Sequence, residues 1–373
     1  MTETAPLRIP DYAGGSLPNL VAELEWRLTG SAISARLHPD LSVRIPEAAS
    51  YVLLMIDGLG DHQLDHRMAS SLAAARQGTL DAPFPTTTTV SLATVASGLP
   101  PSRHGVIGHF MLLEGHPHPV NVLRWVDSTG RPIPDRRPMI PSPNLWERLV
   151  SAGIEPITVQ PRGYSDTPLT RVLYRGCRFE GVDGMIDFVR AVVDLARVPG
   201  RLVFAYFPDV DISAHVHGFG SPAYAQALSG ISAAWDHLSA LLPAHVGMVG
   251  TADHGLVSIE NAGKHRIRRR HHPDLVLYGD PRSLYVRGPS DRIAALGTEV
   301  PATWYPYRQI ESWWGQSGTP AEESALGPRP DGAFLADAGR VLLPGHMDRR
   351  MVGYHGGLDP REVRIPLLVA AAS

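Results

Sequence analysis

The sequence predicts an α/β fold in which a central, largely parallel sheet is flanked by helices, with an inserted cap region beside it. Five short apolar runs, rich in β-branched residues and bounded by turn formers, are typical of buried strands: 51–56, 155–159, 202–207, 246–250 and 366–370. Segments with helical periodicity alternate with them, most clearly at 17–28, 64–76, 144–152, 185–196 and 223–242. In such a fold, sites form beyond the carboxyl ends of the strands.

The pattern changes between residues 262 and 344, and we interpret this segment as the cap region that shapes the substrate cleft. The core is then expected to comprise 1–261 and 345–373. The segment holds a basic run, interpreted as a solvated loop or, alternatively, as an attractor of anionic substrates. Its aromatic side chains are expected to form local core, with stacking on a nucleobase as the alternative. These residues are Arg266, Arg268, Arg269 and Arg270, and Trp304, Tyr305, Tyr307, Trp313 and Trp314.

Composition excludes several classes of protein. The chain has 373 residues and a single cysteine, Cys177, which rules out an internal disulfide and a cysteine-based metal cluster. The net charge of −3 argues against nucleic-acid binding and favours small-molecule partners. The amino terminus lacks signal-peptide character, and no run approaches the roughly 18 to 20 apolar residues of a membrane span. We therefore expect a cytoplasmic protein that binds any metal through histidines and carboxylates. The sequence leaves its oligomeric state open.

Metal-ligating side chains follow two of the expected strands. Asp57 ends the apolar run 51–56, where a turn or helix-capping role is the alternative. Asp211 and His215 follow the run 202–207 and are four residues apart, so on one helical turn they face the same way. Asp209 and His217 in the same segment are competing candidates.

Two further segments complete this set. Asp253 and His254 are adjacent at the end of the run 246–250, and Gly255 can provide the bend that turns both side chains the same way. His355 lies among glycines shortly before the last expected strand. Together the segments offer three carboxylates and three imidazoles, enough for two metal ions with three protein ligands each and open positions for chemistry.

Four successive threonines, 86–89, precede a small-residue helix expected at 90–97 and ended by Gly98. Helix capping is the plain interpretation of one such threonine. A hydroxyl at a helix amino terminus beside a two-metal site is also a candidate nucleophile, because metal charge and the helix dipole favour its ionised form.

These motifs, in this order, resemble the alkaline phosphatase superfamily, and within it the nucleotide pyrophosphatase/phosphodiesterase-like branch. The resemblance implies an alkaline-phosphatase-like core and two Zn²⁺ ions, with Mn²⁺ as the alternative. By motif, one zinc takes Asp57, Thr88, Asp253 and His254, and the other takes Asp211, His215 and His355. Alanine occupies the glycine position of the family's Asp-x-x-Gly-His pattern, here Asp211 to His215.

Thr88 is chosen as the nucleophile because the family places it ten residues before the glycine that is Gly98 here, and Thr87 is the runner-up. Many members carry an asparagine 21 residues after the nucleophile, where it binds a phosphate oxygen. His109 stands at that position in this chain and is the second catalytic candidate.

The resemblance implies a metal-dependent hydrolase that cleaves phosphodiester or pyrophosphate bonds of nucleotide-type substrates through a phospho-threonine intermediate. A phosphonoacetate-type hydrolase or a phosphomonoesterase of the same superfamily is the enzymatic alternative. A non-catalytic metal-binding scaffold is the alternative from another class, and it is disfavoured because all seven candidate positions hold competent residues.

Overall fold

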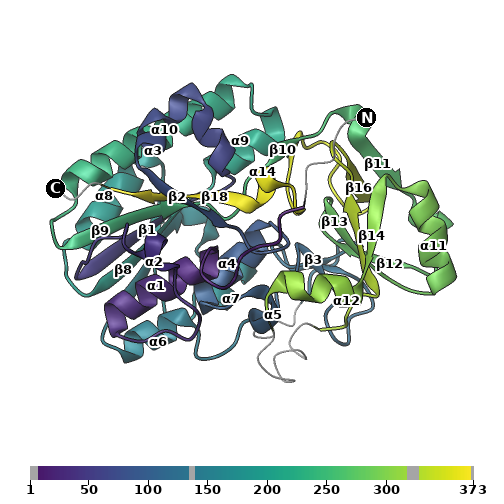
Figure 1. Ribbon diagram of the computed structural model, residues 1–373, viewed down its shortest axis with the longest axis horizontal. Helices are drawn as coiled ribbons and strands as arrows, with labels where there is room; N and C mark the ends of the chain where they lie inside the picture. Colours follow the sequence, from purple (N-terminus) through teal and green to yellow (C-terminus); the bar gives the residue numbers. More distant parts are fainter. Residues whose placement is uncertain (1–6, 134–138, 317–326, 371–373) are drawn as a thin grey trace.

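The computed structural model describes residues 7–133, 139–316 and 327–370. Two sheets lie side by side in it, the larger one carrying helices on both faces (Figure 1). On one face lie α3, α8, α9 and α10, and on the other α1, α4, α6 and α7. This arrangement confirms the predicted α/β class.

The larger sheet has the strand order β2-β18-β9-β1-β8-β6-β7. Within it, β1 pairs in parallel with β8 and β9, and β6 with β7 and β8, so the sheet is largely parallel as predicted. All five expected strands are present, and two that were not expected, β2 and β7, form its edges. The strands are β1 (Ser50–Ile56), β2 (Arg76–Asp81), β6 (Glu155–Pro161), β7 (Arg178–Val182), β8 (Arg201–Phe207), β9 (Val246–Thr251) and β18 (Arg364–Val369).

The last strand, β18, is antiparallel to its neighbours, and this brings the loop before it to the edge of the sheet where the parallel strands end. Strand β18 is antiparallel to both β2 and β9, with Arg364 at its start opposite Asp81 at the end of β2. The amino end of β18 therefore lies at the same edge as the carboxyl ends of β1, β8, β9 and β2. Loops from five distant parts of the chain meet there.

Four of the expected helices are confirmed nearly to the residue: α1 (Leu17–Thr29), α6 (Leu145–Ser151), α8 (Met185–Ala196) and α10 (Pro222–Leu241). Asn144 caps α6 in a reciprocal box with Glu147, which explains why that short helix begins where it does. The others are α2 (Pro39–Ser42), α3 (Ser70–Ala74), α4 (Thr88–Ser97), α5 (Pro101–His104), α7 (Pro168–Leu173), α9 (Asp209–His217), α11 (Ser290–Glu299), α12 (Tyr307–Ile310) and α14 (Pro360–Val363).

The helix expected at 64–76 is wrong as a single element. Two short 3₁₀ turns, Asp61–Asp65 and Arg67–Ala69, precede α3, and the chain is already extended in β2 from Arg76. The reason is tertiary, because β2 is held by its pairing with β18, nearly 300 residues away, which local periodicity does not encode.

The second sheet is smaller because its strands are shorter; it has the order β14-β15-β13-β12-β3-β4-β5, and its neighbouring strands pair antiparallel. Its strands are β3 (Phe110–Met111), β4 (Val120–Asn121), β5 (Val126–Asp127), β12 (Val276–Gly279), β13 (Ser283–Arg287), β14 (Ala302–Pro306) and β15 (Gly332–Ala336). Two small pairs flank it, β10 (Val257–Ser258) with β17 (Gly353–Tyr354), and β11 (Lys264–Ile267) with β16 (Val341–Pro344). Because β3 to β5 precede residue 262, the region beside the main sheet is larger than the predicted segment 262–344.

The aromatic residues of this region pack on one another. Trp313 and Trp314 are buried, and the Trp314 indole donates a hydrogen bond of 2.9 Å to the Tyr285 hydroxyl. The expectation of local core is confirmed for these two. The arginines of the basic run are exposed, as expected of a solvated loop.

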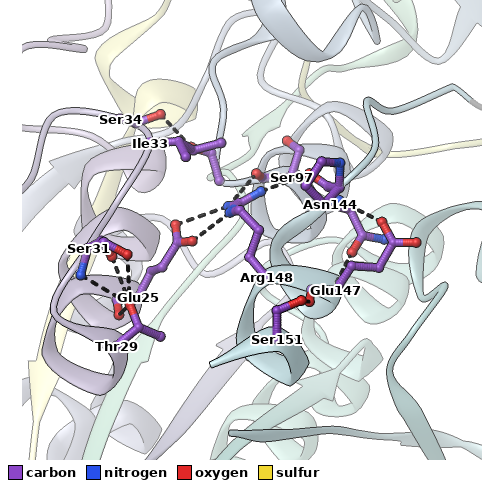
Figure 2. A network of polar contacts seen from close by, with 12 residues as sticks. Glu25, Thr29, Ser31, Ile33, Ser34, Ser97, Asn144, Glu147, Arg148 and Ser151 are labelled. Atoms are coloured by element: carbon purple, nitrogen blue, oxygen red, sulfur yellow. Dashed lines mark hydrogen bonds and ion pairs between the residues drawn. The ribbon is translucent and has the colours of Figure 1, made fainter. Parts of the chain in front are cut away.

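Helix α4, which begins at Thr88, is anchored at its far end (Figure 2). The Arg148 guanidinium donates to the Ser97 carbonyl (3.0 Å) and forms an ion pair of 2.6 Å with Glu25. The Ser34 hydroxyl donates to the Gly98 carbonyl (2.6 Å), so the carbonyls at the helix end are satisfied by side chains. The start of α4 is thereby held in a fixed position at the sheet edge.

Among the described residues, no helix is both long enough and apolar enough to cross a membrane.

Candidate metal centre

The predicted ligands gather at the sheet edge where the five loops meet. Asp57 directly follows β1, and Asp253 and His254 follow β9. Helix α9, which follows β8, carries Asp211 and His215 one turn apart. His355 lies in the loop before β18, which reaches this edge because β18 is antiparallel.

Two groups of ligand atoms are close enough to hold one metal ion each. In each group the ligand atoms lie within 4.8 Å of one another: Asp211, His215 and His355 in one, and Asp57, Asp211 and His254 in the other. The first group matches the expected set. In the second, Asp211 joins Asp57 and His254, while the expected Asp253 lies alongside with its Oδ2 3.4 Å from His254 Nε2. Asp211 is therefore placed between the two groups.

Three buried carboxylate oxygens of this cluster have no hydrogen-bond partner among the residues that the structure describes: Asp57 Oδ1, Asp211 Oδ1 and Asp253 Oδ2. The second oxygen of each carboxylate is engaged, that of Asp211 by His215 Nε2 at 3.2 Å. Asp57 Oδ2 accepts from the Tyr206 hydroxyl, and Asp253 Oδ1 accepts from the backbone N–H groups of Gly58 and His254, both at 2.9 Å. Because an unpaired buried carboxylate oxygen is costly, this donor set fits divalent cations.

All three histidines present the same nitrogen to the cluster. In each ring Nδ1 lies beside a backbone carbonyl, which can only accept, so the Nδ1 proton is held there and Nε2 is left for a metal. The pairs are His215 with Gly353 (2.7 Å), His254 with Gly255 (3.2 Å) and His355 with Thr86 (2.8 Å). The rings of His254 and His355 stack with centroids 3.8 Å apart.

The ionisable side chains of this cluster are buried and close together, so each one shifts the pKa of its neighbours. Burial raises the pKa of Asp57 well above its usual value, and the nearby Asp253 and Asp211 carboxylates raise it further. Burial lowers the pKa of His355 well below its usual value, and the neighbouring His254 and His215 add to this. Burial acts to raise the pKa of Asp211, but its pairing with His215 outweighs this and holds that pKa low. Cations bound between these groups relieve the repulsion.

Two glycines let the carrying loops approach one another. Gly58 has φ +73°, and a Cβ built on it lies 2.6 Å from Leu256 Cδ1 and 3.0 Å from the Asp211 Cα. A Cβ on Gly255 lies 2.1 Å from the Arg361 carbonyl oxygen. The backbone bends at Asp253 and not at Gly255 as predicted, and Gly255 needs to be glycine because its backbone contacts that of Arg361.

The structure separates the two candidate nucleophiles. Thr88 is the first residue of α4, and its Oγ1 lies 3.2 Å from His254 Nε2. Thr87 is the N-cap, but its side chain does not cap the helix and instead hydrogen-bonds to the buried Asp280 carboxylate, which offsets part of the rise that burial gives to the pKa of Asp280. Thr88 therefore faces the metal-ligand cluster and Thr87 faces the second sheet.

Several competing residues lie elsewhere. Asp209 and His217 are exposed on α9, on either side of the buried Asp211. Arg162 pairs with the exposed Asp183 at 2.6 Å. Arg103 donates to the Ile33 carbonyl at 3.3 Å.

His109 is partly buried just before β3 and is held by the second sheet. Its backbone N–H donates to Asp280 Oδ2 (3.2 Å), and its Nε2 lies 2.9 Å from Asn121 Nδ2. Burial lowers the pKa of His109 to about 4, with Arg124, His215 and His346 contributing in the same direction. At neutral pH the ring is uncharged.

Sequence reasoning missed the residues that support the ligands. Tyr206 lies inside a strand, where a tyrosine is typical of core. Asp280 and Arg282 lie in the turn between β12 and β13, where a Gly-Asp-Pro-Arg-Ser sequence indicates a turn and nothing more. The buried Arg282 pairs with the fully buried Glu362 at 3.0 Å, and Glu362 accepts from the backbone N–H of Gly357, two residues after His355.

Comparison with known proteins fits this arrangement. The sequence profile described as type I phosphodiesterase/nucleotide pyrophosphatase matches residues 51–295, well over half of the chain. The chain belongs to this family. The predicted superfamily and branch are thereby confirmed, and the family indicates a phosphoester hydrolase with a divalent-metal site.

Solved structures with the same fold include murine ectonucleotide pyrophosphatase/phosphodiesterase 5, at 17% identity and a TM-score of 0.64, covering 85% of this chain and 87% of that one. An inactive threonine-to-alanine variant of the murine protein, in complex with AMP, has 16% identity and a TM-score of 0.63, again covering 85% of this chain and 87% of that one. Phosphonoacetate hydrolase from Sinorhizobium meliloti, in complex with phosphonoformate, has 17% identity and a TM-score of 0.63, covering 87% of this chain and 91% of that one. A search of curated proteins returns no significant match.

Proposed function

We propose that this enzyme hydrolyses phosphodiester or pyrophosphate bonds of nucleotide-type substrates through a phospho-threonine intermediate on Thr88, with two zinc ions as cofactors. The observation that carries the proposal is the position of Thr88 Oγ1, 3.2 Å from His254 Nε2 at the edge of a cluster that can hold two cations. Membership of the phosphodiesterase family supports the reaction class.

The proposed ligands divide as the motifs suggest. Asp57, Asp253 and His254, with Thr88, would hold one ion, and Asp211, His215 and His355 the other, with Asp211 within reach of both. Three imidazoles among the ligands favour zinc over manganese. When bound, the two cations supply Lewis-acid charge that favours ionised Thr88 and neutralises the phosphoryl oxygens.

The chain's own residues then perform the reaction in two displacements. Ionised Thr88, fixed at the start of α4, attacks phosphorus, and the bond from phosphorus to the leaving oxygen breaks. We propose that backbone N–H groups at the start of α4 and the His109 side chain donate to phosphoryl oxygens. Water then attacks phosphorus, the Thr88 oxygen–phosphorus bond breaks, and the threonine is regenerated.

Charge balance supports a diester over a monoester. Three carboxylates and the Thr88 alkoxide together balance two divalent cations, so the loaded site accepts a monoanionic diester without excess repulsion. A dianionic monoester calls for an added cation; of two candidates, Arg103 donates to the Ile33 carbonyl and Arg162 pairs with Asp183.

The test is hydrolysis of bis-p-nitrophenyl phosphate, p-nitrophenyl thymidine monophosphate and p-nitrophenyl phosphate by the zinc-loaded enzyme. We expect turnover of at least one diester faster than of the monoester. Thr88→Ala should lose at least about 10³-fold in kcat while keeping both metals, and Thr88→Ser should retain measurable activity. Faster hydrolysis of the monoester would overturn the substrate class, and an active Thr88→Ala would overturn the intermediate.

Phosphonoacetate hydrolysis is the second candidate, because the fold matches phosphonoacetate hydrolase as closely as it matches the nucleotide pyrophosphatase/phosphodiesterase. Phosphate release from phosphonoacetate, measured beside the three nitrophenyl substrates, separates the two. Turnover of phosphonoacetate with no turnover of either diester would replace the proposal above.

A further inference from the structure

Asn121 and His109 form a hydrogen-bonded pair whose donor and acceptor can be assigned. Asn121 ends β4 and lies opposite Phe110 of β3, next to His109. Its side-chain Nδ2 is 2.9 Å from His109 Nε2. Asparagine is 8% exposed here, so water contributes little to this contact.

The backbone determines which way the Asn121 amide faces. Its Oδ1 lies 3.1 Å from the backbone nitrogens of both Leu123 and Arg124, which can only donate. Turning the amide over would place its NH₂ group against two N–H donors and break both bonds. The oxygen is therefore on the backbone side, and the NH₂ group faces the imidazole.

The amide in turn determines the proton position on His109. An NH₂ group facing Nε2 makes that nitrogen an acceptor, so the ring carries its proton on Nδ1 and is neutral. The backbone N–H of His109 is held separately by Asp280 at 3.2 Å. Ring and backbone are thus both fixed from the second sheet.

We propose that Asn121 is a positioning residue that locks His109 as a neutral Nδ1–H donor for a phosphoryl oxygen of the substrate. The inference deepens the proposed function and rests on it for the identity of the acceptor. It gives a physical account of the departure at position 109, because a fixed tautomer lets an imidazole act as the single-proton donor that an asparagine amide would be.

The first test reads the tautomer without any reaction. Long-range ¹H–¹⁵N spectra of zinc-loaded, ¹⁵N-histidine-labelled enzyme, with the His109 signal assigned by its loss in His109→Asn, should show a protonated Nδ1 and a bare Nε2. In Asn121→Asp, the carboxylate can only accept, so the proton should move to Nε2 or both nitrogens should be protonated. A protonated Nε2 in the unaltered enzyme would overturn the proposal, even if the enzyme hydrolysed none of the test substrates.

The second test separates positioning from a merely structural role. Asn121→Ala should lower kcat by about 10- to 100-fold on the best substrate, with a smaller change in KM. In a His109→Asn background the same Asn121→Ala change should cost less than about 3-fold, because an asparagine amide carries its own donors and needs no tautomer partner. Equal losses in both backgrounds would show that Asn121 supports only the fold, and would overturn the proposal.

Discussion

The buried ion pair between Arg282 and Glu362 offers the sharpest test of how the second sheet supports the metal centre. Their side chains are 5% and 0% exposed. Arg282 Nε and Nη2 both donate to Glu362 Oε2, at 3.1 and 3.0 Å, and its Nη1 donates to the carbonyls of Ala336, Asp337 and Arg340. Glu362 in turn accepts a hydrogen bond from the Gly357 N–H and so holds the loop that carries His355.

Replacing Arg282 with methionine keeps the bulk of the side chain and leaves the Glu362 carboxylate buried without its partner. Breaking a buried pair from one side costs about 3–5 kcal/mol. At roughly 2 °C per kcal/mol for a chain of this size, the melting temperature should fall by about 6–10 °C. Circular dichroism melting curves at matched protein concentration measure this, and zinc titration before melting reports whether the His355 loop still binds metal.

A double variant checks the reasoning. In Arg282→Met with Glu362→Gln, the amide oxygen still accepts from the Gly357 N–H but no unpaired charge remains, so much of the lost melting temperature should return. The exposed pair of Arg162 and Asp183 is the matched control, and Arg162→Met should leave the melting temperature unchanged. A fall of less than about 2 °C in Arg282→Met, or no recovery in the double variant, would refute the argument.

Three further outcomes follow from the structure. Burial raises the pKa of Asp280 to about 7, above its unfolded value, so ionisation of this carboxyl destabilises the fold as pH rises from about 4 to 7. The melting temperature of Asp280→Asn relative to the parent should therefore increase across that range. A difference that does not change with pH would contradict this. Gly58→Ala should lose metal binding by calorimetry, because its Cβ meets Leu256 and Asp211. Gly30 has a similar φ of +78° and no described atom within 4 Å of a built Cβ, so Gly30→Ala should show backbone strain alone and bind zinc normally. Chelation should abolish activity and lower the melting temperature, with zinc at about 100 times its Kd restoring about 2.7 kcal/mol per site; an unchanged melting curve would show that the cluster binds no metal.

Local sequence signals were sufficient for the main elements and for the types of side chain at the site. Apolar runs predicted the five core strands, and helical periodicity predicted α1, α6, α8 and α10. These predictions succeeded for a physical reason: each of these strands and helices buries one face or both, and the spacing and type of the apolar residues in the sequence reflect that burial directly. The helix expected at 64–76 failed where an edge strand is stabilised by a partner far along the chain.

The site divides in the same way. The sequence by itself predicted which side chains are potential metal ligands and that threonines stand near a helix start, because donor chemistry and spacing belong to the chain. The tertiary structure decided that Asp211 lies between both groups of ligands, that Thr88 and not Thr87 faces them, and that Asn121 and Asp280 hold His109. Those relations depend on the reversed direction of β18 and on the docking of a second sheet, and both arise from pairing between strands that are distant in the sequence.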